Sequence, residues 1–352
     1  MGAVTFEALT GRPVHTQLIE AGHALDHIRL ARAAEAVVVA PATADFVARA
    51  AGGRADDLLT ACLLATRAPV LVAPAMNDRM WDHPQTTKNV AHLREIGYTV
   101  LDPDTGDLAV GEGTGPGRLP EPDVVMAHIG RLLEGAADLA GRHVLVTAGP
   151  TREAVDPVRF ISNRSSGKMG VALAAAAWRR GARVTLVCGP LAVETPVGAD
   201  VVAVESVEEM QSAVAAALPA ADVLVMAAAP ADFRPASLAP EKIKKATAPD
   251  AITLTPTADI LQSTRARRGE QAVVVGFALE TEDVLANARR KLEGKDLDLI
   301  VVNDARESGA GFGVDTNRVT ILARGGATWE LPLMPKGDVA DAILDRVVEL
   351  LP

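Results

Sequence analysis

Short runs of Val, Ala and Leu recur along this chain, and the stretches between them have the length and the pattern of helices. Runs that are apolar throughout are typical of parallel strands buried on both faces. Their alternation with helices predicts an α/β fold built from doubly wound, Rossmann-like sheets. Because 352 residues exceed one ordinary hydrophobic core, we expect two such domains, at residues 1–137 and 138–352.

The apolar runs also place the expected strands. In the first domain they lie at 36–40, 70–73 and 98–101, with helical stretches at 44–51 and 88–96. In the second domain we expect parallel strands at 143–146, 183–187, 201–204, 223–226, 272–276 and 299–302, followed by an antiparallel edge at 318–323 and 328–331. The segment 134–142 is the expected linker.

Composition limits the class of partner. A net charge of −10 argues against nucleic acid as the main partner, although local Lys and Arg clusters can still bind small anions. No apolar run is long enough for a membrane span, and the N-terminus shows neither the basic start nor the apolar core of a signal peptide. Cys62 and Cys188 stand at no metal or disulfide spacing, which predicts a cytoplasmic protein without a cysteine-bound metal.

The longest polar connection, Thr147–Gly170, joins an expected strand to an expected helix at 171–180. Connections in α/β units are usually much shorter, so this one is interpreted as a binding loop. Ser165, Ser166 and Gly167 open the helix, where free N–H groups and the helix dipole favour an anion. The alternative is a well-capped helix behind a polar surface loop.

Two strands of the first domain end in small residues followed by a polar side chain: Pro41, Ala42 and Thr43 after one, Met76 and Asn77 after the other. Since parallel strands bind ligands at their carboxyl ends, this pattern favours a flat ligand laid across the sheet edge. The alternative is that Thr43 and Asn77 only cap helices.

Three further side chains of the first domain leave two interpretations open. His27 lies between Asp26 and Arg29 at the head of an expected helix, where a lone histidine is more often a surface residue than a catalytic one. Met80 and Trp81 fit either a flavin-lining wall or a packed core.

In the second domain, Ala227–Ala229 and Asp232 follow an expected strand. Alanines allow a base or a sugar to approach closely, and the carboxylate can hold a ribose or a metal ion. The lysine-rich segment 241–245 follows, and lysines suit a polyphosphate, although a charge run is often only a solvated surface. Lys291 and Lys295 either add to this charge or pair with the nearby Glu293 and Asp296.

Longer motifs resemble known families. TAGPTREAVDPVRFISNRSSGKMG, AAAPADFRP, APEKIKK, VVGFALET and KDLDLIVVND resemble the phosphopantothenate–cysteine ligases. APATAD, DDLL, LAT and PAMNDRMW resemble the flavin-dependent decarboxylases that act on the ligase product. Their order in one chain resembles the bifunctional bacterial coenzyme A biosynthesis proteins along essentially the whole sequence. The resemblance implies a flavodoxin-like flavoprotein domain followed by a ligase domain.

For the ligase half, the resemblance implies that CTP, with Mg²⁺, activates the carboxylate of 4′-phosphopantothenate as an acyl-cytidylate, which the cysteine amine then attacks. Lys242 matches the lysine used in forming this intermediate, Asn163 the asparagine of its turnover, and Arg159 a residue on the phosphopantothenate side. The positions that match CTP contacts are Met226, Ala227, Ala228, Asp232, Lys242, Thr257, Ala258, Asp259, Ile260, Leu261, Phe277, Lys291 and Lys295.

For the decarboxylase half, the resemblance implies FMN as cofactor, His27 as the active-site histidine and Asn77 as the residue that holds the substrate carboxylate. Pro41, Ala42, Thr43, Met76 and Met80 match positions beside the flavin. The family carries a cysteine on a flap where this chain has Val110, which cannot donate a proton. Relatives also begin with a longer segment that includes a Gly/Ser-rich turn for the FMN phosphate.

The family further implies homo-oligomers, with ligase dimers and flavin-domain trimers that combine into a dodecamer. The expected function is therefore ligation followed by decarboxylation to 4′-phosphopantetheine. The first alternative is a ligase whose N-terminal domain is a catalytically impaired oligomerisation module. A non-catalytic binding protein is the second alternative, and it leaves the joint presence of Asn163, Asp232 and Lys242 without explanation.

Overall fold

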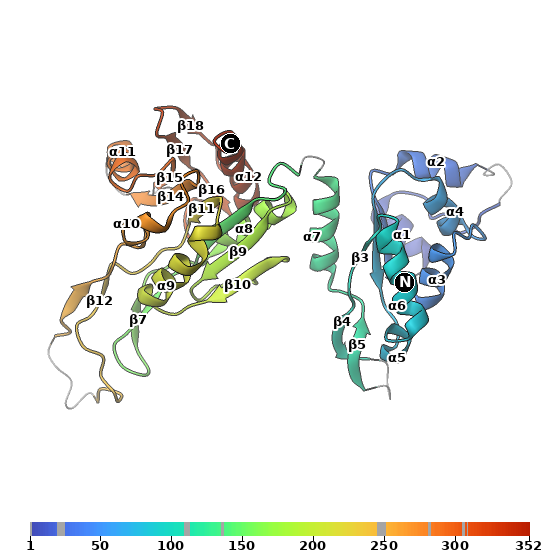
Figure 1. Ribbon diagram of the computed structural model, residues 1–352, viewed down its shortest axis with the longest axis horizontal. Helices are drawn as coiled ribbons and strands as arrows, with labels where there is room; N and C mark the ends of the chain where they lie inside the picture. The colour runs from blue at the N-terminus through green and yellow to red at the C-terminus, as the bar shows by residue number, and fades with distance from the viewer. Residues whose placement is uncertain are drawn as a thin grey trace. The chain divides into compact units, whose positions relative to one another are not determined.

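The computed structural model describes residues 2–19, 25–108, 113–134, 137–244, 251–280, 283–304, 307 and 309–352. The chain forms two compact units, Met1–Gly135 and Ala136–Pro352. Among the described residues, every helix is too short or too polar to cross a lipid bilayer. Figure 1 shows the elements of each unit.

The first unit is built on a parallel sheet in the order β1 (Val37–Ala42), β2 (Val70–Pro74), β3 (Thr99–Val100). Its helices are α1 (Ala3–Thr10), α2 (Asp26–Ala33), α3 (Ala44–Ala51), α4 (Leu58–Ala65), α5 (Asp78–Trp81), α6 (Pro84–Glu95) and α7 (Pro122–Leu133). A separate antiparallel hairpin joins β4 (Asp104–Asp107) to β5 (Thr114–Arg118).

Helices cover both faces of this first sheet. On one face Val72 packs with residues of α3 and α6, among them Phe46 and Leu93. On the other face Leu71 packs with Val125 of α7. All residues of β2 are buried, as its uninterrupted apolar run predicts.

The second unit contains an eight-stranded sheet in the order β10-β9-β6-β11-β14-β15-β17-β18. Its strands are β6 (His143–Ala148), β9 (Arg183–Cys188), β10 (Ala199–Ala203), β11 (Val223–Met226), β14 (Val273–Glu280), β15 (Leu299–Asp304), β17 (Thr320–Ala323) and β18 (Thr328–Glu330). Pairing is parallel from β10 to β15 and antiparallel at β17 and β18, as predicted.

Helices of the second unit also divide between the two faces. α8 (Lys168–Arg179) and α12 (Lys336–Val348) share a core on one face, while α9 (Val207–Ala217), α10 (Ile260–Ser263) and α11 (Val284–Gly294) cover the other. Helix α8 begins three residues before the predicted start at 171, directly after Gly167, whose positive φ of 80° ends the loop. The predicted doubly wound α/β class is confirmed.

The described part of the second unit also contains short pairs of strands and 3-10 turns. They are β7 (Arg152–Ala154) with β8 (Phe160–Ser162), β12 (Phe233–Pro235) with β13 (Leu254–Pro256), β16 (Thr316–Asn317) with β19 (Met334–Pro335), and the turns η1 (Leu218–Ala220) and η3 (Arg265–Arg267). The polar loop 147–170 therefore contains a hairpin that the sequence did not predict. The β12–β13 pair extends from the body of its unit as an arm (Figure 1).

The strand order defines where ligands bind. β9 and β10 follow β6 on one side, and β11, β14 and β15 follow on the other. The order thus reverses between β6 and β11. In doubly wound sheets, ligands bind at the carboxyl ends of the two strands where the order reverses.

Candidate functional site at the switch point

Thr147, near the end of β6, ties the two central strands together at this edge. Its buried Oγ1 accepts a hydrogen bond from the N–H of Ala228 (3.1 Å) and donates to Sδ of Met226 (3.6 Å). The N–H of Ala229 donates to the carbonyl of Gly149 (2.9 Å). The Ala-rich turn is therefore fixed beside the loop that follows β6.

A second set of contacts extends the same edge. Oγ1 of Thr151 accepts from the N–H of Ala231 (2.9 Å), and Ser162 Oγ donates to the Thr151 carbonyl (2.7 Å). Asn163 Nδ2 donates to the carbonyls of Ala229 (2.7 Å) and Pro230 (3.3 Å). Asn163 thus lies directly against the turn to which the sequence assigned the nucleotide.

Most of the residues predicted to contact CTP surround one pocket at this turn. It is lined by Met226, Ala228, Pro230, Ala231, Asp232, Thr257, Ala258, Asp259, Ile260, Leu261, Phe277 and Lys295. Pro230 and Ala231 were not singled out from the sequence, although they stand inside the same Ala-rich motif. Lys291 lies on α11 and is not among these lining residues.

An ion pair crosses this pocket wall. Asp259 Oδ1 caps α10 by accepting the N–H of Gln262 (3.2 Å), while its Oδ2 pairs with Nζ of Lys295 (2.8 Å). The sequence suggested Glu293 or Asp296 as the partner of Lys295. The contact with Asp259 is long-range in sequence and could not be read from helical spacing.

Arg268 binds backbone carbonyls of two segments that line the pocket. Its guanidinium donates to the carbonyls of Leu261 (2.6 Å), Asp296 (3.0 Å) and Lys295 (3.3 Å). Burial lowers the pKa of this arginine. One cation therefore joins the end of α10 to the end of α11.

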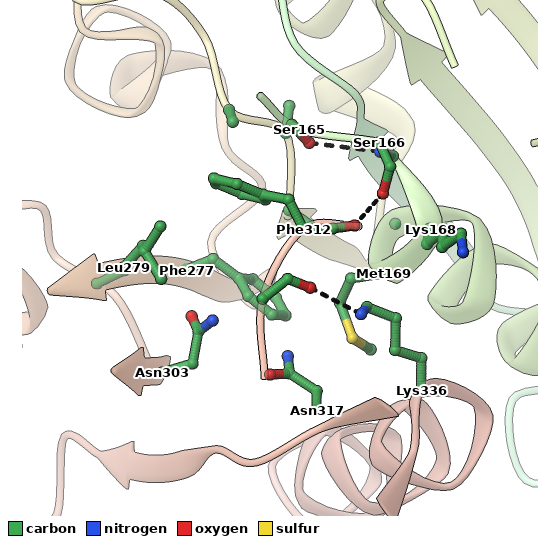
Figure 2. Close-up of a pocket in the computed structure, with 17 residues that line it drawn as sticks. Ser165, Ser166, Lys168, Met169, Phe277, Leu279, Asn303, Phe312, Asn317 and Lys336 are labelled. Carbon is green, nitrogen blue, oxygen red and sulfur yellow. Dashed lines mark hydrogen bonds between the residues drawn. The ribbon is translucent and has the colours of Figure 1, made fainter. Parts of the chain in front are cut away.

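A neighbouring cavity of about 170 Å³ lies at the amino end of α8. Figure 2 shows Phe277, Asn303, Phe312, Asn317 and Lys336 around it. It shares Ala228 and Phe277 with the first pocket, and Ala227 lines it as well. The two pockets are therefore adjoining parts of one site.

Gly170 explains how closely α8 approaches this edge. A Cβ on Gly170 would lie 2.5 Å from the Cβ of Ala148 and 2.8 Å from the carbonyl oxygen of Thr147. No side chain fits there, so the helix can rest directly on β6. The N–H groups at its amino end consequently lie close to the Ala-rich turn, as expected for an anion site.

Lys242 lies in the segment that connects β12 to β13, which we count as part of the arm. It lines a different pocket, with Glu241, Lys244, Ile252 and Thr253 among its neighbours. The structure does not place it in the wall of the pocket at the Ala-rich turn. Its segment is nevertheless anchored. Lys245 and residues 246–250 lie outside the described residues.

The anchor is a buried carboxylate, Asp156. It pairs with Arg159 and accepts the N–H of Ile243 (3.1 Å), while Arg159 Nη2 donates to the Ile243 carbonyl (2.7 Å). The Arg159 guanidinium holds the pKa of Asp156 well below its usual range. The structure therefore places Arg159 as a support for the residue next to Lys242, a contact that the sequence did not reveal.

The residues predicted to contact flavin at the ends of β1 and β2 are neighbours. The N–H of Ala75 donates to the Ala42 carbonyl (3.0 Å), and that of Met76 to Gly117 (3.0 Å). Thr43 caps α3 through Phe46, and Asn77 caps α5 through Arg79 (3.0 Å). Both polar side chains thus make the capping contacts that the sequence left as the alternative.

Met80 and Trp81 have different surroundings. Met80 is 49% exposed, whereas Trp81 packs against the hydrophobic core of the first unit. Pro41 is exposed and Ala42 is buried. Met80 and Pro41 therefore offer free apolar surface beside the strand ends, and Trp81 does not.

His27 lies elsewhere in the first unit, on α2. Its pocket includes Leu18, Ile28 and Leu64, and none of the strand-end residues. The adjacent Asp26 pairs with His15 (3.1 Å) and Arg29 (3.2 Å). Nδ1 of His27 is buried without a hydrogen-bond partner among the described residues, which suits a ring nitrogen that receives a ligand. Val110 lies outside the described residues.

Comparison with known proteins follows the same division of the chain. Residues 139–351 match the DNA/pantothenate metabolism flavoprotein C-terminal domain, and residues 3–134 match the Flavoprotein family. The chain is 45% identical over 352 residues to the coenzyme A biosynthesis bifunctional protein CoaBC of Bacillus subtilis (strain 168), with 99% of this chain and 86% of that protein covered. This chain belongs to the CoaBC family.

Two other CoaBC proteins extend the match. The one from Mycobacterium tuberculosis (strain ATCC 25618 / H37Rv) is 50% identical over 366 residues, with 100% of this chain and 87% of that protein covered. A crystal structure of the C-terminal domain of a CoaBC protein is 39% identical, with a TM-score of 0.52, and covers 61% of this chain and 98% of that one. The resemblance inferred from the motifs is confirmed.

Proposed function

We propose that this chain makes 4′-phosphopantetheine in two steps, CTP-dependent ligation of 4′-phosphopantothenate with cysteine and FMN-dependent decarboxylation of the product. The observation that carries the ligation is the contact of Asn163 with the Ala229 carbonyl at the switch point, beside the pocket that gathers the CTP residues. Membership of the CoaBC family supports the pairing of both activities in one chain.

The pocket at the Ala-rich turn suits a nucleotide. Ala228 has no side chain beyond Cβ, so a base or ribose can approach its backbone, and Phe277 offers an apolar face. Asp232 supplies a carboxylate in the same pocket. Mg²⁺ is commonly bound through one or two carboxylates together with substrate phosphates. No group of three or more metal-ligating side chains occurs among the described residues, so the triphosphate itself would provide most of the ligands.

The ligation consists of two displacements. A carboxylate oxygen of phosphopantothenate attacks the α-phosphorus of CTP, the bond to pyrophosphate breaks, and the acyl-cytidylate forms. The cysteine amine then attacks the acyl carbon, loses a proton, and CMP leaves. The Lys242 ammonium, carried by the anchored arm, would offset charge on the reacting phosphate. The Asn163 amide, held against Ala229, would orient the acyl-cytidylate.

The first unit has side chains that fit a flavin and its substrate. Pro41 and Met80 offer apolar surface, Thr43 is exposed and Met76 is partly exposed at the adjoining strand ends, and the buried Ala42 lies between Pro41 and Thr43. FMN, when bound there, would accept two electrons from the cysteine moiety, which eases the loss of carbon dioxide, and would return them after that loss, so that the net reaction is decarboxylation to a thiol. His27 would exchange a proton at Nδ1, which lacks a partner in the described residues. Asn77 would hold the substrate carboxylate.

One observation favours a second candidate, in which only the ligase is active. Val110 stands where the related decarboxylases carry the flap cysteine. Under this alternative the first unit would act as an oligomerisation module. Ligase dimers and flavin-domain trimers in a cytoplasmic homo-oligomer remain part of the proposal in either case.

Mass spectrometry of products distinguishes these possibilities. The purified chain is given 4′-phosphopantothenate, cysteine, CTP, Mg²⁺ and FMN. Conversion to 4′-phosphopantetheine would support both halves. Accumulation of phosphopantothenoylcysteine would support the ligase-only alternative, and absence of both products would refute the proposal. Replacement of CTP by ATP tests the nucleotide preference.

A further inference from the structure

A glycine-rich segment, Gly309–Asn317, crosses the cavity at the amino end of α8; we call it the strap. It contributes Gly311, Phe312 and Asn317 to the cavity wall, and Figure 2 shows Phe312 and Asn317 on it. Only its last two residues belong to a strand, β16. Most of its carbonyls therefore lack strand partners and need other donors.

Lys336, the first residue of α12, supplies those donors. Its Nζ donates to the carbonyls of Gly311 (2.9 Å), Val314 and Thr316 (3.0 Å), all on the strap. Figure 2 shows the first of these three hydrogen bonds. An ammonium has three N–H groups, so the strap takes all of them. The residue is only 5% exposed.

Apart from these hydrogen bonds, most of the surroundings of Lys336 disfavour a cation. Burial lowers the pKa of Lys336, and the charge of Lys168 lowers it further. A cation at the start of a helix also opposes the helix dipole. Asp315 acts in the opposite sense, but it forms its ion pair with Lys168 (2.6 Å). The strap carbonyls are therefore what holds a lysine at this place.

The other side of the strap is fastened to α8. Ser166 Oγ donates to the Phe312 carbonyl, and Lys168 Nζ donates to the Gly313 carbonyl (3.1 Å). The strap thus spans from α8 to α12, two helices that pack on the same face of the sheet. It lies against the end of α8 where an anion is expected.

We propose that Lys336 is a positioning residue of the ligase site, which holds the strap in place and so forms the cavity before CTP binds. The proposal rests on the proposed ligase function. A wall that is formed in advance costs less free energy to order on binding. Loss of the hydrogen bonds from Lys336 to the strap should therefore weaken CTP binding more than it slows the chemical steps.

The test uses the full chain and two variants of one residue. Lys336→Met keeps the length of the side chain without its donors, and Lys336→Arg keeps the charge in a planar group that fits three surrounding carbonyls less well. We expect the KM for CTP to rise at least about tenfold in Lys336→Met, with kcat changed by less than about threefold, because the lost interaction concerns binding. The KM of Lys336→Arg for CTP should lie between that of the wild type and that of Lys336→Met.

Arg180→Met is the matched control. Arg180 is equally buried, lies just after α8 at the end remote from the strap, and binds Asp138 (3.0 Å) and Asp345 (2.9 Å). It should lower the stability of the unit without changing the KM for CTP. Hydrogen exchange of residues 309–317 should become faster in Lys336→Met and remain unchanged in Arg180→Met.

Each outcome decides one claim. Unchanged exchange in the strap, or faster exchange with an unchanged KM, would overturn the positioning role while ligation by the wild-type chain continues. A wild-type chain that forms no ligation product would overturn the proposed function and the positioning role with it. If Lys336→Met does not fold, Lys336→Arg decides, because a KM equal to that of the wild type would contradict the proposal.

Discussion

The two predicted sites differ in how the fold brings their residues together. At the switch point, the Ala-rich turn and α10 line one pocket, and Asn163 from the loop after β6 binds that turn. They meet because parallel strands end at the same edge. In the first unit, the strand-end residues are neighbours, but His27 lies on a helix that precedes β1 and lines another pocket. A sheet edge therefore explains the whole nucleotide pocket and only part of the flavin site.

The largest effect expected from this contrast concerns Lys242. Lys242→Gln should lower ligation by about 100- to 1000-fold, because it removes the cation that stabilises the reacting phosphate. Mass spectrometry of phosphopantothenoylcysteine measures it. Decarboxylation of supplied phosphopantothenoylcysteine should not change, since that step belongs to the first unit.

Lys244→Gln is the matched control, because Lys244 lines the same pocket two residues further along. Its effect on ligation should be much smaller. Equal ligation by Lys242→Gln and the wild type would mean that the lysine on the arm does not act on the nucleotide. The proposal that the ligase site combines the pocket at the Ala-rich turn with Lys242 on the arm would then be wrong.

His27→Asn tests the other side of the comparison. Decarboxylation should fall about 100-fold, the usual contribution of a positioned acid or base, while ligation and the visible absorbance of bound FMN stay unchanged. Loss of the flavin absorbance would instead show that His27 holds the cofactor. Unchanged decarboxylation would exclude His27 from the reaction.

The limits of the sequence follow from the same contrast. Apolar runs predicted nearly every strand of the large sheet, and the end of one strand predicted where Asp232 would lie, because both signals are local. The sequence did not reveal the Asp156 contact with Ile243 or the Lys336 contacts with the strap. These contacts join segments far apart in the chain, and no periodicity encodes them.

One unused signal did exist for Lys336. It directly follows Pro335 and opens a helix, where acidic side chains are preferred to basic ones. A charge that contradicts the helix dipole indicates a partner elsewhere, although it does not identify that partner. Arg159, by contrast, gave no local sign that its guanidinium supports the arm.

A smaller effect, on stability, is expected from Gly170→Ala. This variant tests whether the second unit depends on the close contact of α8 with β6. The added Cβ would meet Ala148 and Thr147, so we expect the free energy of unfolding to fall by about 1–3 kcal/mol. Gly337→Ala is the control, since a Cβ there meets nothing within 4 Å. Urea unfolding measures both variants, and equal stabilities would contradict the close contact.

The smallest effect concerns Asp57, which caps α4 in the first unit and pairs with Arg49. Burial opposes its ionisation, but hydrogen bonds from Thr60 and Arg49 prevail and lower its pKa to about 2. Because the pKa of Asp57 is lower in the folded chain than its ordinary value of about 4, the charged carboxylate stabilises the fold above about pH 4. This contribution is lost as the pH falls toward 2.

Asp57→Asn keeps a capping acceptor and removes the charge. At pH 6 the variant should be less stable by about 0.3–1 kcal/mol, and the difference should close as the pH approaches 2. Trp81, in a background with Trp178→Phe and Trp329→Phe, reports unfolding of the first unit alone. A difference that stays constant from pH 6 to pH 2 would mean that the cap, and not the charge of Asp57, stabilises this unit.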